Sequence, residues 1–142
     1  MAVITKEELL EKIFKKDFES LKGATLRYTR LRMPGKEVCM AHILTPTDPS
    51  IYDNLGLTIG THEGENHTGE SLGLMYFTPW ECVVVAADTA VKAGRVDIGF
   101  MDRFTGELIL TGPLAEVKSA VYGTIEFFRD ELGFVVCDVF EN

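Results

Sequence analysis

Apolar positions near the N-terminus predict an amphipathic helix over about Lys6 to Lys22. Thr5 and Glu8 have the spacing of a capping box, and Gly23 follows the last apolar residue as a C-cap would. Apolar side chains recur every three or four residues, which gives the helix one apolar stripe beside a face rich in lysine. The stripe consists of Leu10, Ile13, Phe14, Phe18 and Leu21.

Two extended segments and a short helix are predicted next. Residues 25–32 are rich in Thr, Tyr, Leu and Arg and have no fully apolar face, which predicts an exposed strand. Val38 to Leu44 is nearly all apolar, a pattern typical of a strand covered on both faces. Asp48 and Pro49 can start a short helix as N-cap and first residue, and Gly56 can end it.

From Leu72 onward the pattern predicts the order β-α-β-β-α-β. This order is typical of an α+β, ferredoxin-like fold, in which helices cover one face of an antiparallel sheet. Here it would carry a strand and a short helix in front. The expected elements are a strand at 72–77, a helix from Thr78-Pro79 to Gly94, strands at 96–101 and 107–111, a helix from Pro113 to Leu132 with Gly133 as C-cap, and a strand at 134–140.

Residues 60–71 contain glycine, histidine and glutamate but no large apolar side chain, which predicts a surface loop. His62 and His67, with the glutamates between them, are the best metal candidates in the chain. A glycine-rich loop does not hold ligands in a fixed geometry, so we favour a solvated loop and no metal site. His42 lies in an apolar strand and is interpreted as a hydrogen-bonded, buried side chain.

The composition fits one folded domain of 142 residues with 46% hydrophobic residues and a net charge of −8. Residues 1–36 carry nine basic and five acidic residues, whereas the acidic remainder repels phosphate backbones and argues against nucleic acid as a partner. Apolar runs such as Val83 to Ala87 are too short to cross a membrane, and the N-terminus lacks the apolar core of a secretory signal. Three cysteines far apart in the sequence, Cys39, Cys82 and Cys137, predict no disulfide or metal framework and fit a reducing cytoplasm.

Enzyme motifs are absent from the sequence. It contains no dinucleotide or phosphate-binding glycine motif, no HExxH, no nucleophile elbow and no paired-cysteine zinc spacing. We therefore predict no catalytic residues and no cofactor. Trp80, at the start of a predicted helix, is expected to pack on the core.

Short motifs from residue 36 onward carry a family resemblance. The most specific is the run Ile98-Gly99-Phe100-Met101-Asp102-Arg103-Phe104-Thr105-Gly106, with Thr111-Gly112 behind it; Lys36-Glu37-Val38, Ala41-His42-Ile43, Phe77-Thr78-Pro79, Ala87-Asp88 and Lys92-Ala93 add to it. Over residues 27–142 the chain resembles circularly permuted bacterial microcompartment (BMC) shell proteins, as found in ethanolamine-, propanediol- and choline-utilization compartments. The resemblance implies a non-enzymatic homohexamer that tiles with other shell proteins in the bacterial cytoplasm.

The resemblance also implies roles for particular residues. The turn of Asp102, Arg103, Phe104, Thr105 and Gly106 would line a central pore that gates metabolites, and Lys92 would make a contact at the hexamer edge. The permuted domain would span residues 25–142, and its strand at 25–33 would cap the pore through Leu26, Tyr28, Arg30 and Arg32.

Residues 1–24 form an extension that the family pattern does not explain. We expect its apolar stripe to dock on a shell face or on an encapsulated enzyme, with docking on its own domain as the alternative. Two other functions stay open at this point. One is a small-molecule-sensing regulatory domain, by analogy of fold. The other is a metal enzyme that uses His62 and His67.

Overall fold

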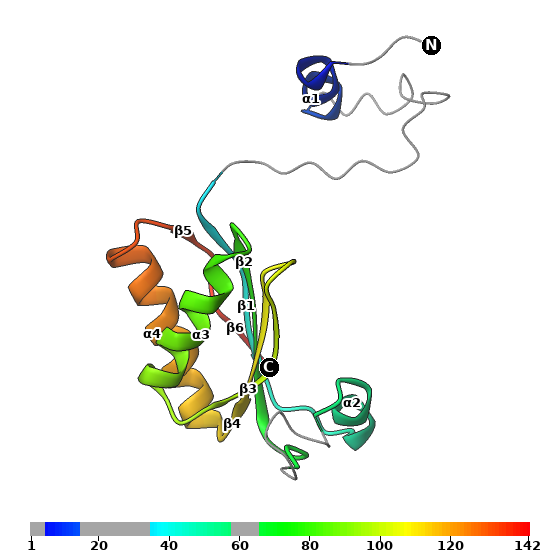
Figure 1. Ribbon diagram of the computed structural model, residues 1–142. Coiled ribbons are helices and arrows are strands. Elements are labelled where there is room, and N and C mark those ends of the chain that lie inside the picture. The colour runs from blue at the N-terminus through cyan, green and yellow to red at the C-terminus, as the bar shows by residue number, and fades with distance from the viewer. Residues whose placement is uncertain (1–4, 15–34, 58–65) are drawn as a thin grey trace. The chain divides into compact units, whose positions relative to one another are not determined.

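The structure is a computed structural model that describes residues 5–14, 35–57 and 66–142 (Figure 1). The chain divides into two compact units, Met1–Met33 and Pro34–Asn142. In the first unit, helix α1 spans Lys6–Phe14. The Thr5 amide donates to Glu8 Oε2 at 3.1 Å and the Glu8 amide donates to Thr5 Oγ1 at 3.2 Å, which confirms the predicted capping box. The rest of the predicted helix and the strand at 25–33 lie outside the described residues.

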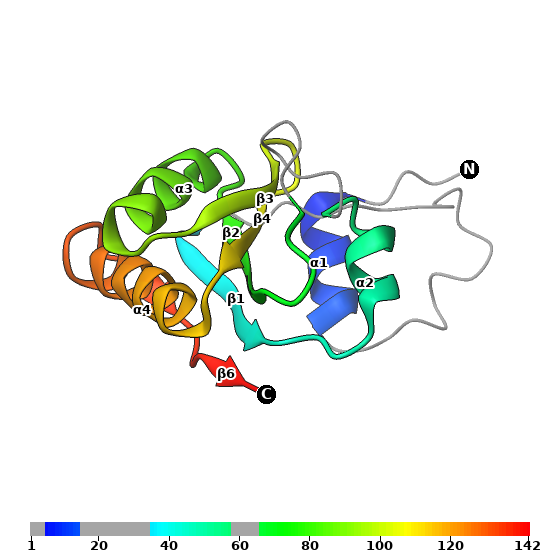
Figure 2. The ribbon, with the colours of Figure 1, turned by 90° about the horizontal axis from the view of Figure 1, so that it is seen from below.

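The second unit is built on one sheet with the strand order β3-β4-β2-β1-β5, to which β6 adds by pairing with β1. Helices α3 (Cys82–Ala93) and α4 (Leu114–Asp130) cover one face of the sheet, whereas α2 (Pro49–Asn54) lies on the other side at one end (Figures 1 and 2). From β2 to β5 the observed order matches the predicted β-α-β-β-α-β, in an α+β domain, and β6 follows as an additional strand. The strands are β1 (Glu37–Leu44), β2 (Ser71–Thr78), β3 (Asp97–Asp102), β4 (Glu107–Gly112), β5 (Val135–Val136) and β6 (Phe140–Glu141).

The prediction of a purely antiparallel sheet is wrong at one edge. β5 and β6 both pair with β1 in parallel, and β1 lies between β2 and β5. The expected single strand at 134–140 is therefore two short strands separated by residues 137–139. The sheet is mixed because β1 runs antiparallel to β2, and the chain that leaves α4 returns alongside β1 in the same direction.

Two other predictions need correction. Strand β1 is not covered on both faces: Val38, Ala41 and Ile43 are buried, but Met40 is 41% exposed, because α3 and α4 pack on one face only. Helix α3 begins at Cys82 and not at Thr78, because Thr78 pairs with Glu37 in the sheet. Two other predicted helix ends are confirmed. Asp48 caps α2 by accepting from the Ser50 amide at 2.9 Å, and Gly133 follows α4 with φ +69°.

Small residues bring α3 and α4 close together over the core. Ala86, Ala90 and Ala120 are fully buried between the helices and the sheet. A Cβ atom added at Gly123 would lie 2.7 Å from Cβ of Ala93, and one added at Gly94 would lie 2.4 Å from the carbonyl oxygen of Glu116. Even a methyl group at either glycine would therefore push the two helices apart.

We predict that Gly94→Ala lowers the free energy of unfolding by about 1–3 kcal/mol, because its new methyl group overlaps backbone that cannot rotate away. Urea unfolding followed by circular dichroism measures the change. The control is Gly35→Ala, where an added Cβ meets nothing within 4 Å. Equal stability of the two variants would contradict the close approach of α3 and α4.

Candidate functional site

The turn between β3 and β4, at residues 103–106, has a defined internal structure. The Gly106 amide donates to the Asp102 carbonyl at 2.9 Å, and Asp102 Oδ1 accepts from the Phe104 amide at 2.8 Å. Gly106 has φ +87°, a conformation that glycine adopts without strain. Asp102 at the start of the turn and Gly106 at its end therefore both favour this turn conformation.

The turn is also attached to the end of β2. The Phe77 amide donates to the Gly106 carbonyl at 3.0 Å, and a Cβ at Gly106 would lie 2.4 Å from the Phe77 carbonyl oxygen. Trp80, expected on the core, is half-buried and lies against the turn, with its ring centroid 6.5 Å from that of Phe104. These contacts hold the turn as part of the sheet end and not as a free loop.

The tip of the turn presents a cation and an aromatic ring. Phe104 is 66% exposed, and the guanidinium carbon of Arg103 lies 5.0 Å from the centre of its ring. The hydrogen bond from the Phe104 amide lowers the pKa of the Asp102 carboxyl, so this side chain is an anion whose charge is directed at the turn backbone. Arg103 is exposed, so the tip offers a positive charge and an apolar surface to a ligand or partner.

Lys92 lies far from this turn. It is in the last turn of α3, exposed, with Nζ 2.6 Å from Asp88 Oδ2. Trp80 precedes α3 at the end that contacts the turn, and 12 helical residues span about 18 Å. The two predicted contact sites are therefore at opposite ends of one helix. Between them α3 exposes Val84, Val85 and Val91.

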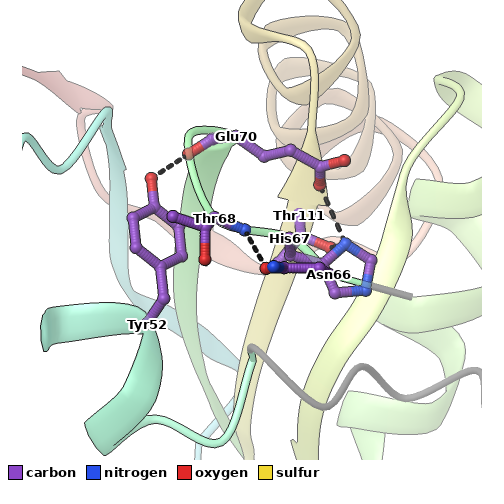
Figure 3. Close-up of polar contacts among 6 residues, drawn as sticks. All are labelled: Tyr52, Asn66, His67, Thr68, Glu70 and Thr111. Carbon is purple, nitrogen blue, oxygen red and sulfur yellow. Dashed lines mark hydrogen bonds and ion pairs between the residues drawn. The ribbon is translucent and has the colours of Figure 1, made fainter. Parts of the chain in front are cut away.

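His67 does not belong to a solvated loop as predicted. It is 2% exposed, and its Nδ1 lies 3.0 Å from Glu70 Oε2 and 3.3 Å from Thr111 Oγ1 on β4 (Figure 3). The Tyr52 hydroxyl of α2 donates to the Glu70 carbonyl, which joins α2 to the same cluster. His62 lies outside the described residues, and within 5–14, 35–57 and 66–142 no three potential ligands gather to hold a metal ion.

The remaining predicted residues fall in different places. His42 forms a hydrogen bond with the Asn142 side chain and packs near the Phe140 ring, as predicted, but it is only partly buried. Leu26, Tyr28, Arg30 and Arg32 lie outside the described residues. Among the helices that the structure describes, none is long and apolar enough to span a membrane.

Comparison with known proteins identifies the family. The BMC domain matches residues 71–139. The bacterial microcompartment shell protein CutR of Streptococcus intermedius is 35% identical over 112 residues, which is 79% of this chain and 89% of CutR. The chain belongs to the bacterial microcompartment shell proteins. The shell protein PduU of Salmonella typhimurium is 32% identical over 107 residues, 75% of this chain and 85% of PduU.

The fold agrees with this assignment to the BMC shell proteins. A solved structure described as a CutR flat hexamer, form 1, aligns with a TM-score of 0.67 and 30% identity, over 82% of this chain and 99% of that one. The predicted function, a structural protein of a microcompartment shell in the bacterial cytoplasm, is confirmed. The matched BMC region contains the whole turn and Lys92, whereas β1 precedes it.

We predict that the turn of this BMC protein loosens in acid. A lowered pKa means that the hydrogen bond of Asp102 is fully present above about pH 3.9, the ordinary aspartate value, and is lost as the pH falls through the lower folded value. The fluorescence of Trp80, the only tryptophan, reports the change because its ring lies beside the turn. Asp102→Asn should remove this acid transition.

The control for this titration is Asp48→Asn. Its carboxyl pKa is also lowered by a backbone hydrogen bond, from Ser50, but it caps α2 at the other end of the sheet (Figure 1). We expect Asp48→Asn to keep the acid transition of the Trp80 signal. An unchanged transition in Asp102→Asn would show that this carboxylate does not order the turn.

Proposed function

We propose that this shell protein assembles into a cyclic homohexamer, acts as a structural tile and not as an enzyme, and packs edge to edge with other shell proteins. The observation that carries the proposal is the alignment of the described domain with nearly the whole chain of a CutR hexamer subunit. A closed ring of heterologous contacts needs two different complementary faces on one subunit. In such a ring the turn at one end of α3 would face the ring axis, and the Lys92 region at the other end would face the rim.

We further propose that the domain, residues 25–142, is a circularly permuted, ferredoxin-like BMC domain. Strand β1 supports this, because it precedes the matched region 71–139 and yet lies inside the sheet between β2 and β5. Without β1, the order of β3, β4, β2 and β5 is that of a ferredoxin-like sheet. A strand moved from one end of the domain to the other would occupy the sheet in this way.

We assign the pore lining to Asp102, Arg103, Phe104, Thr105 and Gly106. The support is physical: the turn is held by hydrogen bonds to Asp102 and Phe77, so its geometry persists while Arg103 and Phe104 stay exposed. Six such turns around an axis would form a ring of positive charge and aromatic surface that can admit or exclude metabolites. Residues 25–33, with Leu26, Tyr28, Arg30 and Arg32, would cap that ring.

Lys92 is proposed as the edge contact between hexamers. Its side chain is 72% exposed, and Asp88 on the same face holds the ammonium group by an ion pair one helical turn away. Exposed Val91 beside it supplies apolar area to the same surface. A contact of this kind fits a flat assembly in which rings meet at their rims.

The assembly prediction concerns mass and shape. The subunit of 15.8 kDa should elute as a particle of about 95 kDa by light scattering, and negative-stain images of that peak should show six-fold rings and sheets. A stable monomer or dimer that binds a metabolite tightly would instead support a regulatory sensor domain.

Two variants distinguish formation of the hexameric ring from the packing of rings into sheets of hexamers. Lys92→Ala should keep the ring mass and lose the sheets, because the edge contact is removed outside the ring interface. Lys118→Ala is the matched control: this partly exposed lysine also forms an ion pair, with Glu141 at 3.1 Å, and its loss should leave both ring and sheets. If both variants lost the sheets of hexamers, Lys92 would have no specific role in the contact between hexamers.

We propose that the N-terminal extension, residues 1–24, attaches an encapsulated enzyme or a shell face. Its apolar stripe and capping box predict a stable amphipathic helix, and such helices bind grooves through residues three and four apart. Deleting residues 1–23 should leave a six-subunit ring and reduce the enzyme content of purified compartments. Loss of the ring would show that the helix docks on its own domain, and no change in either would reject both interpretations.

A further inference from the structure

Two of the three cysteines meet at the edge of the sheet. Strands β1 and β5 pair in parallel, with Glu37 opposite Val135 and Val38 opposite Val136. The pairing continues one step further, because the Cys137 amide donates to the Val38 carbonyl at 3.2 Å. The next residue of β1 is Cys39, so the register places Cys39 beside Cys137.

The backbone spacing at this point suits a disulfide. Neighbouring strands lie about 4.8 Å apart, and disulfides join residues whose Cα atoms are roughly 4.4–6.8 Å apart. Cys39 also sits where the pairing of β1 with β2 shifts register, between Val38 and Met40, which leaves it without a partner residue in the β2 ladder. Its thiol is 3.4 Å from Thr78 Oγ1. This hydrogen bond is weak, so rotation of the Cys39 side chain can break it.

The surroundings of Cys137 and Cys82 differ as well. Burial raises the pKa of the Cys137 thiol, and the nearby groups of Cys39, Asp138 and Glu37 raise it further. The pKa of Cys82 is also raised by burial, but the charges that act on it are those of Glu81 and Lys36. All three thiols are free and partly buried in the structure. The strand register therefore pairs Cys39 with Cys137, whereas Cys82 lies at the start of α3.

We propose that Cys39 and Cys137 form an intrachain disulfide when the protein meets a small-molecule disulfide such as oxidised glutathione. One cysteine thiolate attacks a sulfur of the small disulfide, forms a mixed disulfide and releases one small thiol. The second cysteine, deprotonated in turn, attacks the protein sulfur of that mixed disulfide and releases the other small thiol. The protein loses two thiols, and one small disulfide is reduced to two thiols.

The bond would act on the weakest part of the sheet. Strand β5 has only two residues, and Val135 beside the bond is 68% exposed. A covalent link from Cys137 to β1 closes a loop of roughly 100 residues, which restricts the unfolded chain and ties the C-terminal segment to the sheet. The disulfide between Cys39 and Cys137 would thus hold the C-terminal segment on the sheet under oxidising conditions.

The test is oxidation of the reduced full-length protein with oxidised glutathione. The number of free thiols titrated in denaturant should fall from three per chain to one. A non-reducing peptide map should contain the Cys39–Cys137 link. The midpoint of thermal unfolding should rise by about 5 °C or more and return on reduction. In the Cys82→Ser variant the number of free thiols per chain should fall from two to none. The Cys39→Ser and Cys137→Ser variants should form no intrachain link.

Several results would overturn the proposal. These are retention of three thiols in the wild type, persistent mixed disulfides at Cys39 or Cys137, a link that includes Cys82, or a link between two chains. The peptide map of the wild type decides the question even if a serine variant fails to fold. The three thiols of the reduced starting protein, counted before oxidation, are its internal control.

Discussion

Close packing of α3 on α4 is the constraint on which the rest of the domain depends. Ala93, Gly94 and Gly123 leave no room for larger side chains where the helices meet. Both helices can therefore lie side by side on one face of the sheet and bury its apolar residues. The part of the opposite face that α2 leaves uncovered, the turn after β3 and the outer surface of α3 stay available for contacts outside the domain.

The same arrangement fixes the two ends of α3 relative to the sheet. At one end, Trp80 and Phe77 contact the turn that holds Arg103 and Phe104. At the other end, the backbone at Gly94 packs against α4. A shell subunit must present its contacts in fixed directions, because errors in angle accumulate from one copy to the next. Rigid placement of both ends of α3 is consistent with this need.

Local signals in the sequence predicted much of this fold, and non-local pairing did not follow from them. The Thr5 capping box, the Asp48 cap and the turn ending at Gly106 depend on residues a few positions apart, and all three are found in the structure. The parallel pairing of β5 with β1 depends on strand order, which no nearby residue specifies. His67 was mistaken for a solvated residue because Thr111, its partner from β4, lies far along the chain.

The buried cluster around His67 has a consequence for the tolerance of the chain to change. The His67 amide donates to the Leu57 carbonyl at 3.2 Å, and the His67 ring is fixed between Glu70 and Thr111. The backbone bond joins Leu57 and His67, the residues on either side of 58–66. The entropic cost of closing a chain segment grows only slowly with the length of that segment. Insertions between Leu57 and His67 therefore cost the domain little. Evolution, or an engineer who grafts a peptide there, can alter this segment of a shell tile and leave the sheet and helices as they are.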